Sequence, residues 1–226
     1  LGEDPLLAGA LVSAEIKGIQ DKGLMATVKH FAANNQESER GTGVSVVDER
    51  TLQEIYLPAF EQAVKADVAS FMCSYNRLAI DGKGNNYSCA NKSLLTDILR
   101  DQWGYKGFVM TDWYATLFEQ KAPDLTPIKA GLDMEMPSSF FMGEPLKNAV
   151  TKGDIPASYV DQAVGRILTQ MERFHMLDGQ MLPRAKMADL AVEHAASALK
   201  AAEEGAVLLK NINAVLPLQA ADFDNL

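Results

Sequence analysis

Apolar and polar positions along the chain follow helical and strand-like spacing in turn. Helical spacing predicts helices at residues 6–20, 51–63, 93–102, 159–174 and 190–204, with a helical turn at 127–130. Short apolar runs of strand length separate them, at residues 24–28, 68–72, 108–110 and 206–209. Strands that alternate with helices predict parallel βαβ units with right-handed crossovers.

Local signals divide these elements. Thr51 to Glu54 form a capping-box pattern, and Pro58 should kink or interrupt the helix behind it. Polar, Gly-containing stretches at 34–44 and 81–86 are typical of loops. The composition changes around Pro183, which predicts a linker at 179–186. We therefore expect one domain at residues 1–180, and a linker with the beginning of a second domain at 181–226.

Composition narrows the function classes. The 226 residues are 47% hydrophobic and 23% charged, as in ordinary globular proteins. The net charge of −9 argues against nucleic acid and anionic membranes as partners, because both attract concentrated positive charge. No stretch approaches the roughly 20 apolar residues of a membrane span. Two Cys and three His do not have the spacing of a structural zinc site, so we expect no metal.

Candidate chemistry follows the predicted strands. In parallel α/β proteins, ligands bind at the carboxyl ends of the strands, where the loops converge. The polar and aromatic residues at these positions are Lys29, His30, Tyr75, Asn76, Thr111, Asp112, Trp113, Asp133 and Glu135. Carboxylates beside aromatic faces suit a sugar, whose C–H faces stack and whose hydroxyls form hydrogen bonds. The sequence therefore indicates a carbohydrate site.

Each of these residues also has a structural interpretation. Asp112 could only cap the following helix, and Lys29 with His30 could be a surface pair. Trp113 and Tyr75 could serve packing, and Met72 could belong to the core. Spacing alone leaves both interpretations standing.

Several segments, in order along the chain, resemble the β-glucosidases of glycoside hydrolase family 3. They are Lys29 to Glu37 (KHFAANNQE), Arg50 to Phe60 (RTLQEIYLPAF), Met72 to Asn76 (MCSYN), Gly107 to Trp113 (GFVMTDW), Ala130 to Pro137 (AGLDMEMP) and Ala206 to Asn211 (AVLLKN). The resemblance runs from Gly2 to about Leu218. It implies a (β/α)8 barrel followed by an α/β sandwich domain. A barrel of this type takes about 250 residues, so we expect the C-terminal part of the barrel and the start of the sandwich.

The same resemblance implies roles for individual residues. Asp112 would be the catalytic nucleophile. Lys29, His30, Met72, Tyr75 and Trp113 would bind the sugar, with Arg40 and Glu135 as weaker candidates. No metal or organic cofactor is implied. A retaining glycosidase needs an ionised carboxylate for attack and a protonated acid about 5–5.5 Å away.

Two positions distinguish this sequence from other branches of the family and make the substrate prediction more specific. Ala32-Ala33-Asn34 stands where the N-acetylglucosaminidase branch has Pro-Gly-His. Trp113 favours the glucosidase type over the xylosidase type, which tends to have Cys there. We expect release of terminal, non-reducing β-D-glucosyl residues from β-linked glucosides or oligosaccharides. The alternatives are a β-xylosidase or exo-glucanase of the same family, or a non-catalytic sugar-binding homologue.

Two expectations concern the rest of the protein. In the family, the acid/base Glu lies in the second domain beyond the position of Leu226, and an earlier barrel portion supplies an Asp and an Arg. We therefore expect the rest of the same polypeptide to be required, and the 226 residues alone to lack normal turnover. The oligomeric state is left open.

Cys73 and Cys89 flank the 81–86 loop, as a Cys pair does in similar family members, so we expect a disulfide. The alternative is two reduced thiols, as in a cytosolic protein. The disulfide favours a periplasmic or secreted location.

Overall fold

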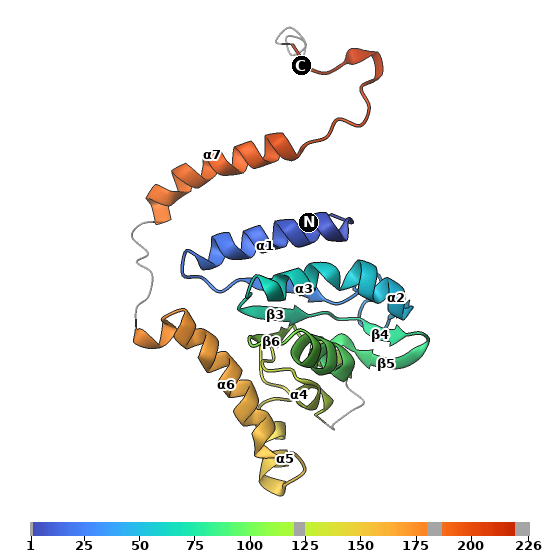
Figure 1. The fold of residues 1–226 in the computed structure, drawn as a ribbon, viewed down its shortest axis with the longest axis vertical. Helices are drawn as coiled ribbons and strands as arrows, with labels where there is room; N and C mark the ends of the chain where they lie inside the picture. The colour runs from blue at the N-terminus through green and yellow to red at the C-terminus, as the bar shows by residue number, and fades with distance from the viewer. Residues whose placement is uncertain (1, 120–124, 180–186, 220–226) are drawn as a thin grey trace. The chain divides into compact units, whose positions relative to one another are not determined.

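The computed structural model describes residues 2–119, 125–179 and 187–219 (Figure 1). The chain divides into two units, Leu1–Gln180 and Met181–Leu226. The identity of these units as a partial barrel and the start of a second domain stays a prediction. Apart from Gly179, the predicted linker at 179–186 lies outside the described residues.

The first unit is built on a parallel sheet with strand order β1-β3-β6. Its strands are β1 (Thr27–Phe31), β3 (Ser70–Cys73) and β6 (Phe108–Thr111). Met134 extends the sheet by a parallel bridge to Met110. The prediction of parallel βαβ units is therefore confirmed. However, the first strand lies three residues later than the apolar run at 24–28, because pairing with β3 begins at Thr27.

The predicted loop at 34–44 is confirmed up to residue 43, and a second small sheet begins at Val44 and takes in most of residues 81–86. Its order is β2-β4-β5, with β2 (Val44–Val47), β4 (Arg77–Ile80) and β5 (Lys83–Tyr87). β4 pairs in parallel with β2 and forms an antiparallel hairpin with β5. The loop prediction for 81–86 was wrong beyond the turn at Asp81 and Gly82. β5 is polar and exposed, and its pairing with β4 makes it a strand.

Helices and helical turns connect these strands. Those of the first unit are α1 (Pro5–Gln20), α2 (Glu49–Thr51), η1 (Leu52–Tyr56), α3 (Pro58–Lys65), η2 (Ser88–Ala90), η3 (Ser93–Gln102), η4 (Ala115–Glu119), α4 (Thr126–Ala130), α5 (Glu144–Lys152), α6 (Ala157–Arg173) and η5 (Met176–Asp178). The predicted interruption at Pro58 is confirmed, since a π-helical segment ends at Tyr56 and Pro58 begins α3.

Capping explains where two of these helices start. Asp4 accepts hydrogen bonds from the N–H groups of Leu6 and Leu7, and it thereby caps α1. The capping box predicted at Thr51 was wrong. Asp48 is the N-cap, and its side chain accepts the N–H of Thr51, so the helical segment starts two residues earlier.

An aromatic cluster fills the core between the sheet and α3. Phe31 and Phe71 are fully buried, and their ring centroids lie 5.3 Å apart in an edge-to-face contact. Phe60 of α3 and Tyr105 pack against the same rings. Helix α1 covers α3 from outside (Figure 1). The carboxyl ends of β1, β3 and β6 are therefore carried on a rigid support.

The second unit contains α7 (Met187–Gly205) and the short turn η7 (Ile212–Ala214). The helix matches the one predicted at 190–204. The predicted strand at 206–209 was wrong, because those residues have no regular structure and are exposed. An apolar run becomes a strand only with a pairing partner, and the described residues supply none here.

Candidate active site

Asp112 directly follows β6, at the carboxyl end of the central sheet. Its backbone N–H donates to the carbonyl oxygen of Cys73 at 3.3 Å, which continues the β3–β6 pairing by one residue. Gly107 leads into β6, and a Cβ there would overlap the Ala69 carbonyl oxygen and the Tyr105 side chain. The glycine lets β6 approach β3 closely, and this fixes the position of Asp112.

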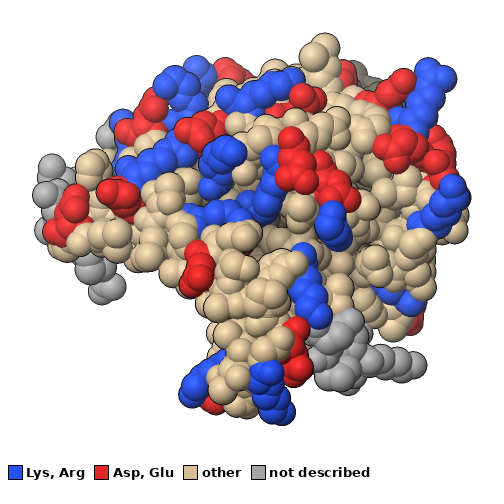
Figure 2. Space-filling model, turned by 60° about the horizontal axis from the view of Figure 1, so that its bottom comes forward, with Lys and Arg blue, Asp and Glu red and all other residues tan. Residues whose placement is uncertain are grey.

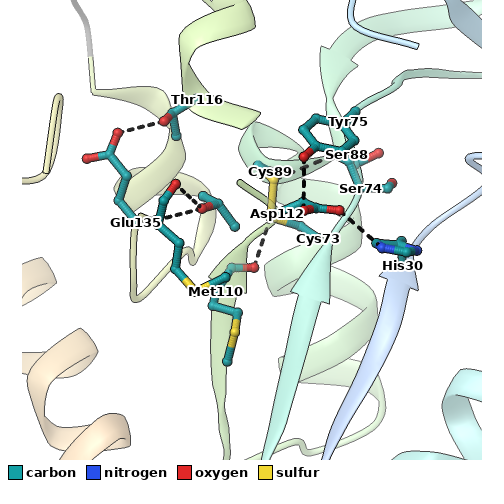
Figure 3. The surroundings of a disulfide bond; sticks show 12 residues. His30, Cys73, Ser74, Tyr75, Ser88, Cys89, Met110, Asp112, Thr116 and Glu135 are labelled. Carbon is teal, nitrogen blue, oxygen red and sulfur yellow. Dashed lines mark hydrogen bonds and ion pairs between the residues drawn. A yellow bond between two sulfur atoms is a disulfide. The ribbon is translucent and has the colours of Figure 1, made fainter. Parts of the chain in front are cut away.

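Three donors surround the Asp112 carboxylate, and two of them, Tyr75 and His30, are drawn in Figure 3. Oδ1 accepts the Tyr75 hydroxyl at 2.9 Å and the Trp113 backbone N–H at 2.6 Å. Oδ2 lies 3.1 Å from Nε2 of His30. The side chain is 13% exposed, so it is desolvated but reachable. The structure brings together the end of β1, the loop after β3 and the end of β6.

Tyr75 is held as a hydrogen-bond donor. Burial raises its pKa to about 12, and the hydrogen bond to Asp112 acts in the same direction. The phenol is therefore protonated at neutral pH. The guanidinium carbon of Arg40 lies 4.2 Å from the Tyr75 ring centroid, and Arg40 also pairs with Glu37 at 2.6 Å. Arg40 thus contacts the Asp112 site through Tyr75.

His30 is the second partner of Asp112. Burial lowers its pKa, and the neighbouring charge of Lys29 lowers it further. The imidazole is therefore neutral at pH 7, and in its Nε2–H tautomer it donates to Oδ2. Lys29 itself is exposed at the same strand end. A neutral donor holds the carboxylate without cancelling its charge.

The loop after β1 is fixed by Ser74, for which the sequence predicts no role, and by Asn76, which it places among the strand-end candidates. The Ser74 hydroxyl and the Asn76 side-chain amide both donate to the Ala32 carbonyl oxygen, at 3.1 and 3.2 Å. Both side chains are buried. They keep the chain beyond His30 against the end of β3. Their position in the MCSYN segment is the sequence signal that points to them.

Trp113 and Met72 occupy different environments. The Trp113 side chain is 59% exposed beside the nucleophile candidate, so its face is available to a ligand. Met72 is half-buried in β3, where it pairs in register with Met110. The backbone N–H of Trp113 contacts Asp112, so the structure places Trp113 at the site. Met72 lies on β3, the strand next to β6.

Glu135 points away from Asp112 (Figure 3). Its Oε1 accepts the Thr116 hydroxyl at 2.6 Å, and its Oε2 accepts the backbone N–H groups of Phe141 and Met142, both at 2.9 Å. The carboxylate joins η4 to the loop after Met136. This geometry favours a role in holding two loops that follow strand ends.

Asp133 lies deeper than any of these groups. Its side chain is fully buried and pairs with Arg100 at 2.6 Å and Arg166 at 2.8 Å. The Val109 N–H donates to it as well, at 2.8 Å. These contacts join β6 to η3 and α6. Asp133 is therefore a structural carboxylate, although it follows an apolar run just as Asp112 does.

Cys73 and Cys89 form a disulfide in the structure, next to the strand end that supports Asp112 (Figure 3). Cys73 closes β3 and Cys89 lies in η2. The bond ties the β4–β5 hairpin to the central sheet.

Surface charge, side-chain clusters and helix lengths add three observations. On the face drawn in Figure 2, Lys and Arg side chains alternate with Asp and Glu, and neither sign forms a broad field. Across the described ranges, no three His, Cys, Asp or Glu side chains gather as metal ligands do. No helix in that part of the chain is both long and apolar enough to cross a membrane.

Comparison with known proteins finds relatives that match nearly the whole chain. Residues 1–170 match the model of the glycosyl hydrolase family 3 N-terminal domain. A β-glucosidase from Rhizobium radiobacter is 44% identical, over 99% of this chain and 26% of its own length. An exo-α-(1→6)-L-arabinopyranosidase from Bifidobacterium breve is 38% identical, over 99% of this chain and 28% of its own.

Solved structures show the same similarity. DesR, a β-glucosidase from Streptomyces venezuelae crystallised with D-glucose, superposes with a TM-score of 0.81 at 44% identity, over 96% of this chain and 28% of its own. The chain therefore spans less than a third of the length of these relatives.

Proposed function

The chain belongs to glycosyl hydrolase family 3, and from this premise we propose that it forms part of a retaining β-glucosidase with Asp112 as the nucleophile. The observation that carries the proposal is the Asp112 carboxylate at the end of β6, held by Tyr75, His30 and the Trp113 N–H. Its neighbours are a protonated phenol and a neutral imidazole. These donors orient the carboxylate, as a nucleophile requires.

In the proposed reaction, Oδ2 attacks the anomeric carbon of a β-glucoside. Oδ1 is engaged by two donors, whereas His30 is the contact of Oδ2 among the described residues. The bond from Oδ2 to the anomeric carbon forms as the glycosidic bond breaks, and the leaving oxygen takes a proton from a general acid. Water then cleaves the glycosyl–Asp112 ester, so two inversions give retention.

We propose that the general acid and further sugar contacts come from the rest of the same polypeptide. Two facts support this. Glu135 is occupied by Thr116 and two backbone N–H groups, and the chain spans 26–30% of the length of several β-glucosidases. Within this proposal, the chain is the C-terminal part of the barrel and the start of the sandwich domain.

Sugar recognition is assigned to the groups around Asp112. Lys29 and His30 would bind hydroxyls, Trp113 would stack on a sugar face, and Met72 would line the subsite. Arg40 would act through Tyr75. A glucosyl group is the substrate favoured by the β-glucosidase relatives, although the arabinopyranosidase relative keeps a different sugar in consideration. A periplasmic or secreted location is proposed on the ground of the disulfide.

The test uses 2,4-dinitrophenyl 2-deoxy-2-fluoro-β-D-glucoside, whose leaving group needs no general acid. It is applied to the 226-residue chain and to a chimera. In the chimera, this chain replaces the matching segment of the R. radiobacter β-glucosidase. Peptide mapping by mass spectrometry locates the label, and a β-xyloside analogue tested beside it gives the sugar preference.

We expect the label on Asp112 in the chimera, and turnover of an aryl β-glucoside by the chimera but not by the 226-residue chain alone. A label on another residue would overturn the nucleophile assignment. A folded chimera without label or turnover would favour a non-catalytic sugar-binding protein.

A further inference from the structure

Away from the Asp112 site, a cavity lies between η3, α4 and α6, with a volume of about 440 Å³. It shares none of its lining residues with the Asp112 site. Its size falls in the range of small-molecule sites, about 300–1,000 Å³. The cavity is therefore large enough for a small solute and is independent of the glycosidase proposal.

The lining of this cavity is strongly basic in a chain whose net charge is −9. Its cations are Lys92, Arg100, Lys106, Lys129 and Arg166, and Asp101 is the acidic residue that lines it. These cations come from four places along the chain. Such a concentration raises the local positive potential and attracts anions.

Internal ion pairs neutralise only part of this charge. Lys92 pairs with Asp97, and Arg100 and Arg166 share Asp133. Lys106 and Lys129 are exposed and have no ion pair among the residues that the structure describes. The cavity thus retains an excess of positive charge after its carboxylates are counted.

Arg100 adds an unsatisfied donor. Its Nε is buried and has no hydrogen-bond partner within the described structure, while its other nitrogens are bonded to Asp133, Gly131 and Gly107. A buried N–H without an acceptor is costly. Tyr159 and Gln162 also line the cavity and can donate to a bound group.

We propose that this cavity binds a phosphate group, either as inorganic phosphate or as the monoester of a small sugar. A phosphate offers several acceptor oxygens and up to two negative charges, which match the excess positive charge of the lining and its two lysines without an ion pair in the described part of the chain, Lys106 and Lys129. A single carboxylate would leave part of this charge unmatched. The volume leaves room for a sugar beside the phosphate.

Titration of the 226-residue chain with inorganic phosphate, glucose 6-phosphate and glucose tests this proposal. Binding is followed by calorimetry and by NMR at constant ionic strength. The variants are Lys106→Gln, Lys129→Gln and their combination, with Lys22→Gln as the matched control. Lys22 is an exposed lysine that does not line the cavity. Circular dichroism verifies that each variant is folded.

We expect saturable binding of phosphate, with Kd raised roughly tenfold by each cavity variant and unchanged by Lys22→Gln. Tighter binding of glucose 6-phosphate identifies a monoester ligand, and equal affinity identifies inorganic phosphate. Glucose should not compete. Absence of saturable phosphate binding up to about 10 mM, or equal binding by the double variant, would overturn the proposal.

Discussion

Two aspartates in the first unit show how the same residue type acquires opposite roles. Asp112 and Asp133 lie at neighbouring places on the sheet, and each carboxylate accepts a backbone N–H. Asp133 is fully buried and is neutralised by Arg100 and Arg166. Asp112 remains partly accessible and is held by neutral donors. A charged partner makes a carboxylate structural, whereas neutral partners leave its charge available for chemistry.

The largest expected effect is a loss of activity when Asp112, but not Asp133, is the residue replaced. Asp112→Asn should lower turnover of an aryl β-glucoside by the chimera by at least about 10⁴-fold, because the nucleophile is lost. The free energy of unfolding should change by less than about 1 kcal/mol, because the amide keeps most of the local contacts. Steady-state kinetics and urea unfolding measure the two quantities. Near-normal turnover would contradict the assignment.

Asp133→Asn should show the reverse pattern. It leaves Arg100 and Arg166 without a compensating charge, and we expect the free energy of unfolding to fall by about 3–5 kcal/mol. Urea unfolding of the 226-residue chain measures it. Asp161→Asn, at an exposed position on α6, is the control and should change stability by less than about 0.5 kcal/mol. Equal stability of the Asp133 and Asp161 variants would contradict the structural role of Asp133.

Removal of the Tyr75 hydroxyl tests how much a neutral donor contributes to the function of Asp112. Tyr75→Phe keeps the ring beneath Arg40 and removes the donor to Oδ1. A hydrogen bond to a charged group contributes about 1.5–3 kcal/mol, so kcat of the chimera should fall roughly 10- to 100-fold. The KM should change less than kcat. An unchanged kcat would mean that the Trp113 N–H and His30 suffice to orient the carboxylate.

The smallest effect concerns pH. Because the folded pKa of His30 lies below its ordinary value of 6.5, the unfolded chain takes up a proton first as the pH falls. The stability linked to His30 is therefore complete above pH 6.5 and decreases as the pH falls below it. Thermal unfolding between pH 5 and 7.5 should show this decrease in the parent chain and a shallower one in Lys29→Gln. Identical pH profiles for the two would contradict it.

The residues of the Asp112 site were easier to predict from the sequence than the buried ion pairs of Asp133 that hold the elements around it. Asp112, His30 and Tyr75 follow apolar runs that form parallel strands, so the rule of carboxyl ends predicts that they meet. Family resemblance added the role of nucleophile, which remains a prediction. By contrast, Arg100 and Arg166 each lie 33 residues from Asp133, on different helices. No periodicity along the chain signals such a pair, because it depends on how helices pack in three dimensions.

Burial and pairing partners together explain which strands the sequence predicted correctly and which it did not. The continuous apolar runs of β3 and β6 are buried on both faces, and the sequence shows them clearly. β5 is rich in Gly and Asn and is a strand through its pairing with β4. The apolar residues 206–209 have no such partner within the described ranges and form no strand. Pairing partners decided the cases that hydrophobicity did not.

The contacts of Glu135 have a consequence for engineering. One carboxylate holds both η4, through Thr116, and the loop that contains Phe141 and Met142. Exchanging only one of the two segments would remove one side of these hydrogen bonds and leave the polar groups on the other segment without partners. Residues 113–119 and 135–142 therefore form one exchangeable module, and transplants between homologues should move them together.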